Sequence, residues 1–227
     1  MKNEPLKIAA SLWSANLAEL GQSIINVDKY CYSYHFDIMD GHFVPNLLFG
    51  PDIIKALRPY TKKPFEVHFM VENTEALLNE FLQSGADFVT IHPEVCDDYL
   101  RIIRFLHHND KKAGIAVNVE IPGQEFEKIL PEIDYIVLMG TKLGIKGVSI
   151  SPEVFGKIAY LRNVIDRNNY PVNIQIDGGI RENTVPELYQ HGADIVTAGS
   201  LLFNNDFEKV TQWFRSLSRE SAAATKL

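Results

Sequence analysis

Two histidines and two aspartates stand in apolar segments of this chain, where charged side chains are uncommon. They are His35 and Asp37 in YHFDIM (34–39), His68 in FEVHFM (65–70) and Asp177 in VNIQID (172–177). Alternate residues of a β-strand point to the same side, so we expect His35 and Asp37 to share one face. Because burying an unpaired carboxylate costs several kcal/mol, each aspartate needs a charged or hydrogen-bonded partner.

The same alternation sorts the neighbouring side chains into two faces. One face carries aromatic and aliphatic residues: Tyr34, Phe36, Ile38, Phe65, Val67, Phe69, Val172, Ile174 and Ile176. The other face carries the four residues above together with Met39, Glu66, Met70, Asn173 and Gln175. We therefore expect the strands to turn the first face outward, toward covering helices, and the second face inward.

Imidazole nitrogens and carboxylate oxygens suit a divalent first-row metal such as Zn²⁺, Fe²⁺, Mn²⁺ or Co²⁺. One cation would compensate all four side chains at once, whereas without it each would need a separate partner. The alternative is that the histidines are ordinary core residues and that each aspartate pairs with an arginine. No inward strand position supplies an arginine. The pattern favours a metal site and does not choose among the metals.

Eight apolar runs of strand length recur along the chain, and segments with apolar residues at helical spacing separate them. The runs are 7–11, 34–39, 65–70, 88–92, 112–117, 135–139, 172–177 and 195–199. Strands that alternate with helices are typical of parallel βα units. Eight such units predict an α/β fold, a single-domain (β/α)8 TIM barrel over residues 1–220, with 221–227 as a disordered tail. Asp37, His68 and Asp177 fall in the later halves of their strands, toward the end where such barrels have their active sites, and His35 shares the inward face of Asp37.

Two glycine-containing segments follow the last two predicted strands. They are DGGIRENT, with Gly178 and Gly179, and AGSLLF, with Gly199 and Ser200. Glycine lets backbone N–H groups approach an anion closely, and barrels of this kind often bind phosphate after the seventh and eighth strands. Either glycine segment could be only a turn, but their place in two consecutive units favours a phosphate site.

The composition argues against several classes of function. The chain has 227 residues, 46% of them hydrophobic, which is enough for one domain with a large core. A net charge of −7 and a pI near 5.5 argue against binding to nucleic acid or to an anionic membrane. No apolar run approaches the roughly 18 residues of a membrane span. Cys31 and Cys96 form no CxxC motif and the N-terminus shows no signal-peptide pattern, so we expect reduced thiols and a cytoplasmic location.

Beyond these patterns, the chain resembles the ribulose-phosphate 3-epimerase family from about residue 7 to residue 205. The segments that carry the resemblance are SLWSANLAELG (11–21), FDIMDGHFVPN (36–46), EVHFMVEN (66–73), GADFVTIHPE (85–94), AGIAVN (113–118), IDGGI (176–180) and GADIVTAGSLLF (192–203). The stretch DIMDGHFVPN is long and specific, whereas other phosphate-binding barrels share the glycine-rich pieces.

The resemblance implies roles for individual residues. It implies that the metal ligands are His35, Asp37, His68 and Asp177, and that Asp37 and Asp177 are also the catalytic acid and base. It implies a substrate channel formed by Ser11, Met39, Met70 and Met139, with the phosphate at Gly178, Gly179, Gly199 and Ser200. The implied cofactor is one divalent transition metal: Zn, Fe, Mn or Co.

The implied protein is an isomerase of carbohydrate metabolism, an epimerase that inverts C3 of a ketose phosphate such as the pentose phosphate ribulose 5-phosphate. One carboxylate removes a proton from one face of a flat enediolate and the other returns a proton to the opposite face. Positioned acid–base groups contribute about 10²–10⁴-fold each. A divalent cation stabilises the developing negative charge. The apolar methionines would help to exclude water, although each could equally be a core residue.

One segment departs from the family. After the sixth strand the family carries a loop like NPGFGGQ, whereas this chain has KLGIKGVSISP (142–152). The segment keeps Gly144, Gly147 and Pro152, but Leu143, Lys146 and Val148 replace proline, glycine and glutamine, and Ala10 replaces a proline elsewhere. The family's loop covers the substrate, so we expect substrate contacts from Gly144, Lys146 and Gly147. Lys146 would bind the phosphate or a substrate hydroxyl, or else be an ordinary solvated lysine.

Three alternatives stay open at this point. The substrate could be a hexulose phosphate of the allulose 6-phosphate type. The chain could be a non-catalytic phosphosugar-binding barrel, although the four intact ligands argue against it. A decarboxylase or aldolase would need an inward lysine at a strand end, and no predicted strand supplies one. The resemblance also implies a homo-oligomer, since family members are commonly dimers or hexamers.

Overall fold

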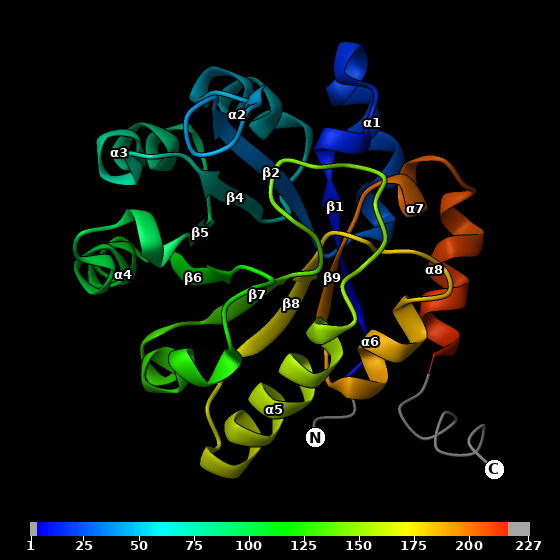
Figure 1. Ribbon diagram of the computed structural model, residues 1–227. Helices are drawn as coiled ribbons and strands as arrows, with labels where there is room; N and C mark the ends of the chain where they lie inside the picture. The colour runs from blue at the N-terminus through cyan, green and yellow to red at the C-terminus, as the bar shows by residue number, and fades with distance from the viewer. Residues whose placement is uncertain (1–3, 218–227) are drawn as a thin grey trace, which may run out of the picture.

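The computed structural model describes residues 4–217, so the predicted tail, 221–227, lies outside the described residues. Parallel strands form a central barrel and helices surround it (Figure 1). The strands are β1 (Lys7–Ser11), β2 (Ser33–Asp40), β3 (Leu47–Leu48), β4 (Phe65–Met70), β5 (Phe88–Ile91), β6 (Lys112–Val117), β7 (Tyr135–Met139), β8 (Asn173–Asp177) and β9 (Ile195–Ala198). The predicted (β/α)8 barrel is confirmed.

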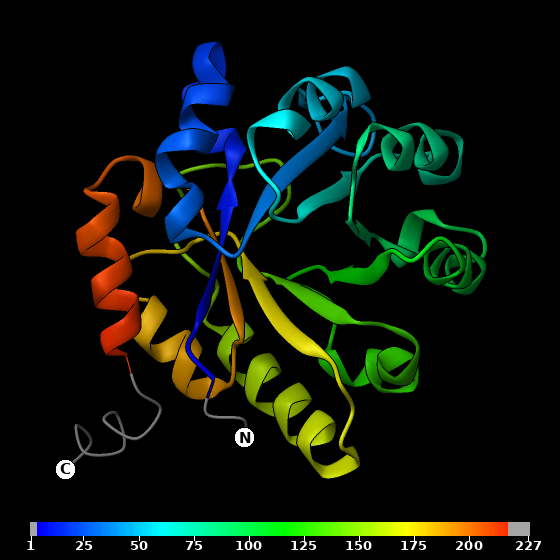
Figure 2. The same ribbon diagram turned by 180° about the vertical axis from the view of Figure 1, so that it is seen from behind.

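The helices lie outside the strands on every side, as the view from behind also shows (Figure 2). The α-helices are α1 (Leu20–Val27), α2 (Pro51–Leu57), α3 (Thr74–Ser84), α4 (Tyr99–His108), α5 (Glu153–Asn168), α6 (Val185–His191), α7 (Ser200–Phe203) and α8 (Phe207–Ser216). The 3-10 helices are η1 (Leu12–Ser14), η2 (Leu17–Glu19), η3 (Asp28–Tyr30), η4 (Arg58–Tyr60), η5 (Pro93–Val95) and η6 (Gly123–Glu132).

The barrel closes where the first strand meets both the second and the last. β1 pairs in parallel with β2, with Ser11 opposite His35, and in parallel with β9, with Ala10 opposite Ala198. The two-residue strand β3 adds an antiparallel pairing to β2, with Leu48 opposite Met39. This short strand was not predicted. Closure leaves the eight barrel strands without a free edge, since every one has two neighbours.

Two segments differ from the helices that the apolar spacing predicted. The segment after β6 forms the 3-10 helix η6 instead of an α-helix, and Pro131 lies inside it. Proline lacks the N–H that an α-helix needs and its ring clashes with the preceding turn, which disfavours a regular α-helix here. The short helix α7 directly after β9 was also not predicted, and the apolar pattern at 206–217 corresponds to α8.

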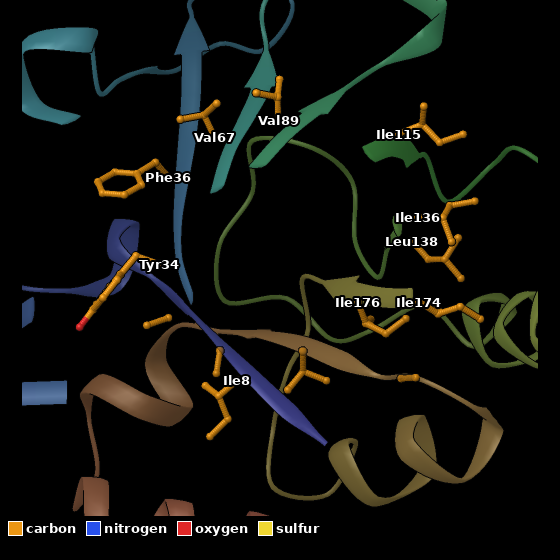
Figure 3. Packing of buried hydrophobic residues seen from close by; sticks show 14 of the residues in the cluster. Ile8, Tyr34, Phe36, Val67, Val89, Ile115, Ile136, Leu138, Ile174 and Ile176 are labelled. Atoms are coloured by element: carbon orange, nitrogen blue, oxygen red, sulfur yellow. The ribbon is translucent and has the colours of Figure 1, made fainter. Parts of the chain in front are cut away.

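The outward faces of the strands form one large apolar cluster with the surrounding helices. Figure 3 labels Ile8, Tyr34, Phe36, Val67, Val89, Ile115, Ile136, Leu138, Ile174 and Ile176, all at most 4% exposed. Full burial of such a side chain stabilises the fold by about 1.5–3 kcal/mol. Smaller apolar clusters fill the interior, one around Val137 and Met139 and another around Met39 and Met70. The predicted outward and inward faces are therefore confirmed for these residues.

Among residues 4–217, no helix combines the length and the apolar character needed to cross a membrane. Cys31 is buried and Cys96 is half-buried, and both are free thiols. Burial raises the pKa of the Cys31 thiol to about 11, which keeps the thiol protonated and unreactive near neutral pH.

Candidate active site

The four predicted ligands meet at one point inside the barrel. His35 and Asp37 come from β2, His68 from β4 and Asp177 from the end of β8, and one ligand atom from each lies within 4.8 Å of all the others. Their spacing follows from the strand register, which places Asp37 directly opposite His68 on adjacent strands. The histidines are completely buried, and Asp37 is 4% exposed.

The separations between these atoms fit a shared cation better than hydrogen bonds. His35 Nε2 lies 3.4 Å from Asp37 Oδ1 and 3.3 Å from Asp177 Oδ2, and His68 Nδ1 lies 3.4 Å from Asp177 Oδ2. Neither nitrogen has a hydrogen-bond partner within residues 4–217, although both are buried. Ligands about 2.0–2.2 Å from one ion lie at such distances from each other. The residues present therefore fit a divalent metal.

Glu66 orients His35 from the opposite side of its ring. The Glu66 carboxylate is fully buried, and its Oε2 lies 3.1 Å from His35 Nδ1. A proton on Nδ1, assigned here from this partner, leaves Nε2 with its lone pair turned toward the two aspartates. Gln175 Nε2 donates to Glu66 Oε2 at 2.8 Å, and the Thr90 hydroxyl donates to Oε1 at 3.0 Å. The buried charge is thus compensated by specific donors, as a buried carboxylate requires.

A second chain of contacts orients His68. His68 Nε2 lies 2.9 Å from His92 Nε2, and the two rings stack with centroids 5.1 Å apart. His92 Nδ1 lies 3.2 Å from Glu94 Oε1, which also accepts a hydrogen bond from the Asn118 amide. Burial lowers the pKa of His92 to about 4, so its ring is neutral near neutral pH. A neutral His92 can donate from Nδ1 to Glu94 and accept at Nε2 from His68 Nε2. With its proton on Nε2, His68 keeps a lone pair on Nδ1 that can bind a metal.

The electrostatics of this centre favour a positive charge. Burial alone would lower the pKa of His35, but the carboxylates of Glu66, Asp177 and Asp37 raise it well above its usual value. Burial alone would raise the pKa of Asp177, but His35 and His68 lower it. The two shifts have different causes: three carboxylates surround His35, whereas two imidazoles lie beside Asp177. A bound divalent cation would compensate the negative charge of Asp37 and Asp177.

A cavity of about 260 Å³ opens at the carboxyl ends of the strands, and two of the predicted ligands, Asp37 and Asp177, line it. Of the predicted site residues, it is lined by Ser11, Asp37, Met70, Met139, Gly144, Lys146, Gly147, Asp177, Gly178, Gly179, Gly199 and Ser200. His35 and His68 lie beneath it. Met39 is buried against Val44 and Met70 and does not line the cavity. Ser11 Oγ donates to Asp37 Oδ2 at 3.3 Å, so this serine positions one of the aspartates.

The backbone conformation of the turn after β8 requires glycine at two positions, whether or not an anion binds there. Gly178 and Gly179 have φ of +92° and +72°, in the left-handed region that favours glycine. A Cβ on Gly179 would lie 2.7 Å from the backbone of Ile150, and one on Gly178 would lie 2.4 Å from Thr141 Oγ1. These glycines therefore let the loop after β7 pack against the turn after β8.

Several residues that line the cavity were not among the predicted site residues. They are Trp13, Ser14, Thr141, Lys142, Ile145, Ile180, Arg181 and Thr197, together with Leu143 and Val148, which the sequence marked only as departures from the family loop. Arg181 is the most informative, because its Nη1 donates to Ser200 Oγ at 3.3 Å and brings a cation to the glycine-rich end of the cavity. Its position directly after DGGI was the available signal, since a cation beside glycines favours an anion.

The fold and the position of the cavity place this chain in the class of (β/α)8-barrel enzymes, whose sites occupy this end of the barrel. The model of the ribulose-phosphate 3-epimerase family matches residues 7–203. A ribulose-phosphate 3-epimerase of Escherichia coli (strain K12) is 34% identical over 212 residues, which cover 92% of this chain and 94% of that relative. One of Bacillus subtilis (strain 168) is 34% identical over 206 residues, 90% of this chain and 95% of the relative. The chain therefore belongs to the ribulose-phosphate 3-epimerase family, and it is an isomerase.

Solved structures at lower identity share the fold alone. A 3-keto-L-gulonate-6-phosphate decarboxylase from Vibrio cholerae superposes with a TM-score of 0.70 at 14% identity, over 94% of this chain and 97% of that chain. A 3-hexulose-6-phosphate synthase superposes with a TM-score of 0.67 at 14% identity, over 95% of this chain and 100% of that chain. The family resemblance seen in the sequence is thus confirmed at the level of sequence identity, and the barrel at the level of structure.

Proposed function

We propose that this protein is a metal-dependent ketose-phosphate 3-epimerase that interconverts ribulose 5-phosphate and xylulose 5-phosphate. The observation that carries the proposal is the convergence of His35, Asp37, His68 and Asp177 beneath a cavity with a cation at its far end. The names of the relatives support the choice of a pentulose phosphate. The altered loop at 142–148 is the reason to test a hexulose phosphate, the allulose 6-phosphate type, beside it.

Asp37 and Asp177 are the two groups that move the proton at C3. They come from β2 and β8, which β1 and β9 separate in the barrel, so their carboxylates reach the cavity from different strands. A substrate carbon between them can lose a proton to one carboxylate and regain a proton from the other on the opposite face. Inversion then needs no rotation of the substrate. Acid–base transfer of this kind contributes about 10²–10⁴-fold for each positioned group.

The rest of the cavity orients the substrate. Arg181, the Ser200 hydroxyl and the backbone at Gly178 and Gly179 would bind the phosphate, since a guanidinium and N–H groups recognise its oxygens. Met70 and Met139 present apolar surface beside the aspartates, which helps to exclude water and offers no competing proton. When bound by the four ligands, a divalent cation (Zn, Fe, Mn or Co) would supply Lewis-acid stabilisation of negative charge that develops next to C3.

Hydrogen exchange at C3 tests the proposal directly. The purified protein is incubated in D2O with ribulose 5-phosphate, xylulose 5-phosphate or allulose 6-phosphate, and NMR follows deuterium at C3 while metal content is measured on the same sample. We expect deuterium at C3 and formation of the 3-epimer with the pentulose phosphates, and about one divalent metal per chain. Binding without exchange for every sugar would instead support a non-catalytic phosphosugar-binding barrel.

Two further expectations accompany this proposal. A homo-oligomer stays a prediction, which light scattering of the purified protein would check. A cytoplasmic location also stays a prediction, which fractionation of the producing cell would check.

A further inference from the structure

The loop after β7 (residues 140–151) crosses the mouth of the barrel toward β1 and β2 (Figure 1). Its middle residues make the contacts that close it. Leu143 packs with the apolar cluster that includes Trp13, Met39 and Met70. A Cβ on Gly144, which has φ of +69°, would lie 2.7 Å from Asn46 Oδ1, so the loop also lies directly against the segment after β2. The loop is therefore seated over the cavity by side chains from two other units.

Lys146 makes two contacts with a single residue, Trp13, in the segment after β1. Its Nζ lies 4.2 Å from the centroid of the Trp13 ring and donates a hydrogen bond to the Trp13 carbonyl oxygen. The two residues are 133 positions apart in the chain. An ammonium group carries three N–H donors, so the carbonyl and the ring face leave donor capacity for a ligand.

The ammonium of Lys146 belongs to the sugar side of the cavity. Both Lys146 and Trp13 line the cavity. Trp13, the partner of Lys146, lies two residues after Ser11, whose Oγ donates to Asp37 Oδ2 at 3.3 Å, so this contact lies on the Asp37 side of the cavity. The glycine-rich end has its own cation in Arg181, which donates to Ser200. A cation near Asp37 would meet the oxygens of the sugar beside the reacting carbon, and Arg181 would meet the phosphate.

We propose that Trp13 and Lys146 form a latch that holds the loop after β7 closed over the cavity, and that the Lys146 ammonium binds a hydroxyl or carbonyl oxygen of the substrate. The inference rests on the proposed function, because it assigns a further contact to the same ketose phosphate. It answers the open question about Lys146: this lysine is neither a phosphate ligand nor an ordinary solvated residue. Lys146 would thereby take part in selecting the substrate.

The latch can be tested without substrate. The chain has two tryptophans, so Trp213→Phe leaves Trp13 as the single tryptophan of the metal-loaded protein, and it is excited at a wavelength that tyrosine does not absorb. In that background, Lys146→Met removes the cation and the donor, and should shift Trp13 emission and raise the acrylamide quenching constant roughly twofold, since the ring loses its covering ammonium. Lys146→Arg keeps both and should match the parent. Lys55→Met, an exposed lysine on α2, is the matched control and should also match it.

The substrate contact is tested by two probes, ribulose 5-phosphate and inorganic phosphate, titrated calorimetrically in the protein with native Trp213. For Lys146→Met we expect the Kd of ribulose 5-phosphate to rise by about 10–100-fold, the effect of one charge-assisted hydrogen bond. The Kd of inorganic phosphate should not change. KM should follow Kd, and Lys146→Arg should restore most of the loss.

Each result supports or overturns one half of the inference. Unchanged quenching in Lys146→Met overturns the latch. An equal loss of affinity for inorganic phosphate overturns the assignment to the sugar, and an unchanged Kd for ribulose 5-phosphate in Lys146→Met overturns the substrate contact. If the wild-type protein showed no C3 exchange with any ketose phosphate, the proposed function would fail, while the quenching comparison would still decide on the latch.

Discussion

The strand-borne centre and the loop after β7 face the same cavity, but the molecule holds them in different ways. His35 and His68 are completely buried, and ladder pairing on both sides of each strand sets their positions. In the loop, Ile145 and Val148 are 47% and 41% exposed, and the loop is seated by contacts with distant segments. A site on paired strands keeps its geometry within narrow limits, whereas a loop can open and close. The centre is therefore suited to chemistry and the loop to selecting and covering the substrate.

Metal removal should separate the two regions most strongly. Dialysis against a chelator should abolish C3 exchange, because the four ligands lose the cation that compensates them. The melting temperature should fall by about 5–10 °C for a ligand present at about 100 times its Kd, because metal binds only the folded state. Trp13 quenching should not change, since the latch involves no ligand residue. A metal-free protein with full activity would falsify the metal site.

Replacing either aspartate should have the next largest effect. Asp37→Asn and Asp177→Asn should each lower kcat/KM by about 10³-fold or more, because each removes a proton carrier and weakens a ligand. Each variant is expected to keep solvent exchange with one epimer only, which NMR in D2O would show. Asp40→Asn, at the end of the same strand as Asp37 but outside the cavity, is the control. Near-normal turnover in either site variant would contradict the two-base assignment.

Glu66→Gln tests whether the interior polar network positions His35. The change keeps the shape of the side chain but removes the charge that favours a proton on His35 Nδ1. Metal affinity, measured by competition with a chromophoric chelator, should fall about 10–100-fold. Thr90→Val removes a different hydrogen bond to Glu66 and should have a smaller effect on metal affinity, since Gln175 still donates to the carboxylate. An unchanged metal affinity in Glu66→Gln would mean that Glu66 acts through packing alone.

Two glycine substitutions should have the smallest effects. They compare a position in the loop after β7 with a position in the turn after β8, against which that loop packs. Gly179→Ala would hold an alanine in the left-handed region and place its Cβ 2.7 Å from Ile150. We expect this substitution to displace the loop after β7, to raise KM and to cost about 1–3 kcal/mol of stability. Gly147→Ala, at φ of +80°, meets no atom within 4 Å and should cost only about 1–2 kcal/mol of local strain. Thermal unfolding and KM measure both. A larger effect at Gly147 would mean that the loop tip has partners beyond the described contacts.

Much of the centre could be predicted from sequence because its causes are local. Strand alternation alone put His35, Asp37 and His68 on inward faces, and the count of βα units predicted the barrel that brings them together. The helical spacing after β6 predicted an α-helix wrongly, because Pro131 disfavours a regular α-helix although the apolar pattern around it has helical spacing. The sequence did not predict Arg181 as a site residue, because a single cation after a turn carries no periodic signal.

The sequence by itself determined which side chains face the interior, because alternation along a strand is a property of the backbone that needs no neighbour. Only the tertiary structure decided which of those side chains meet. Gln175 donates to Glu66 across 109 positions, and Lys146 reaches Trp13 across 133. The first contact depends on barrel closure and the second on the path of a loop. Neither leaves a repeating pattern in the chain, because both are set by packing between segments that are distant in sequence.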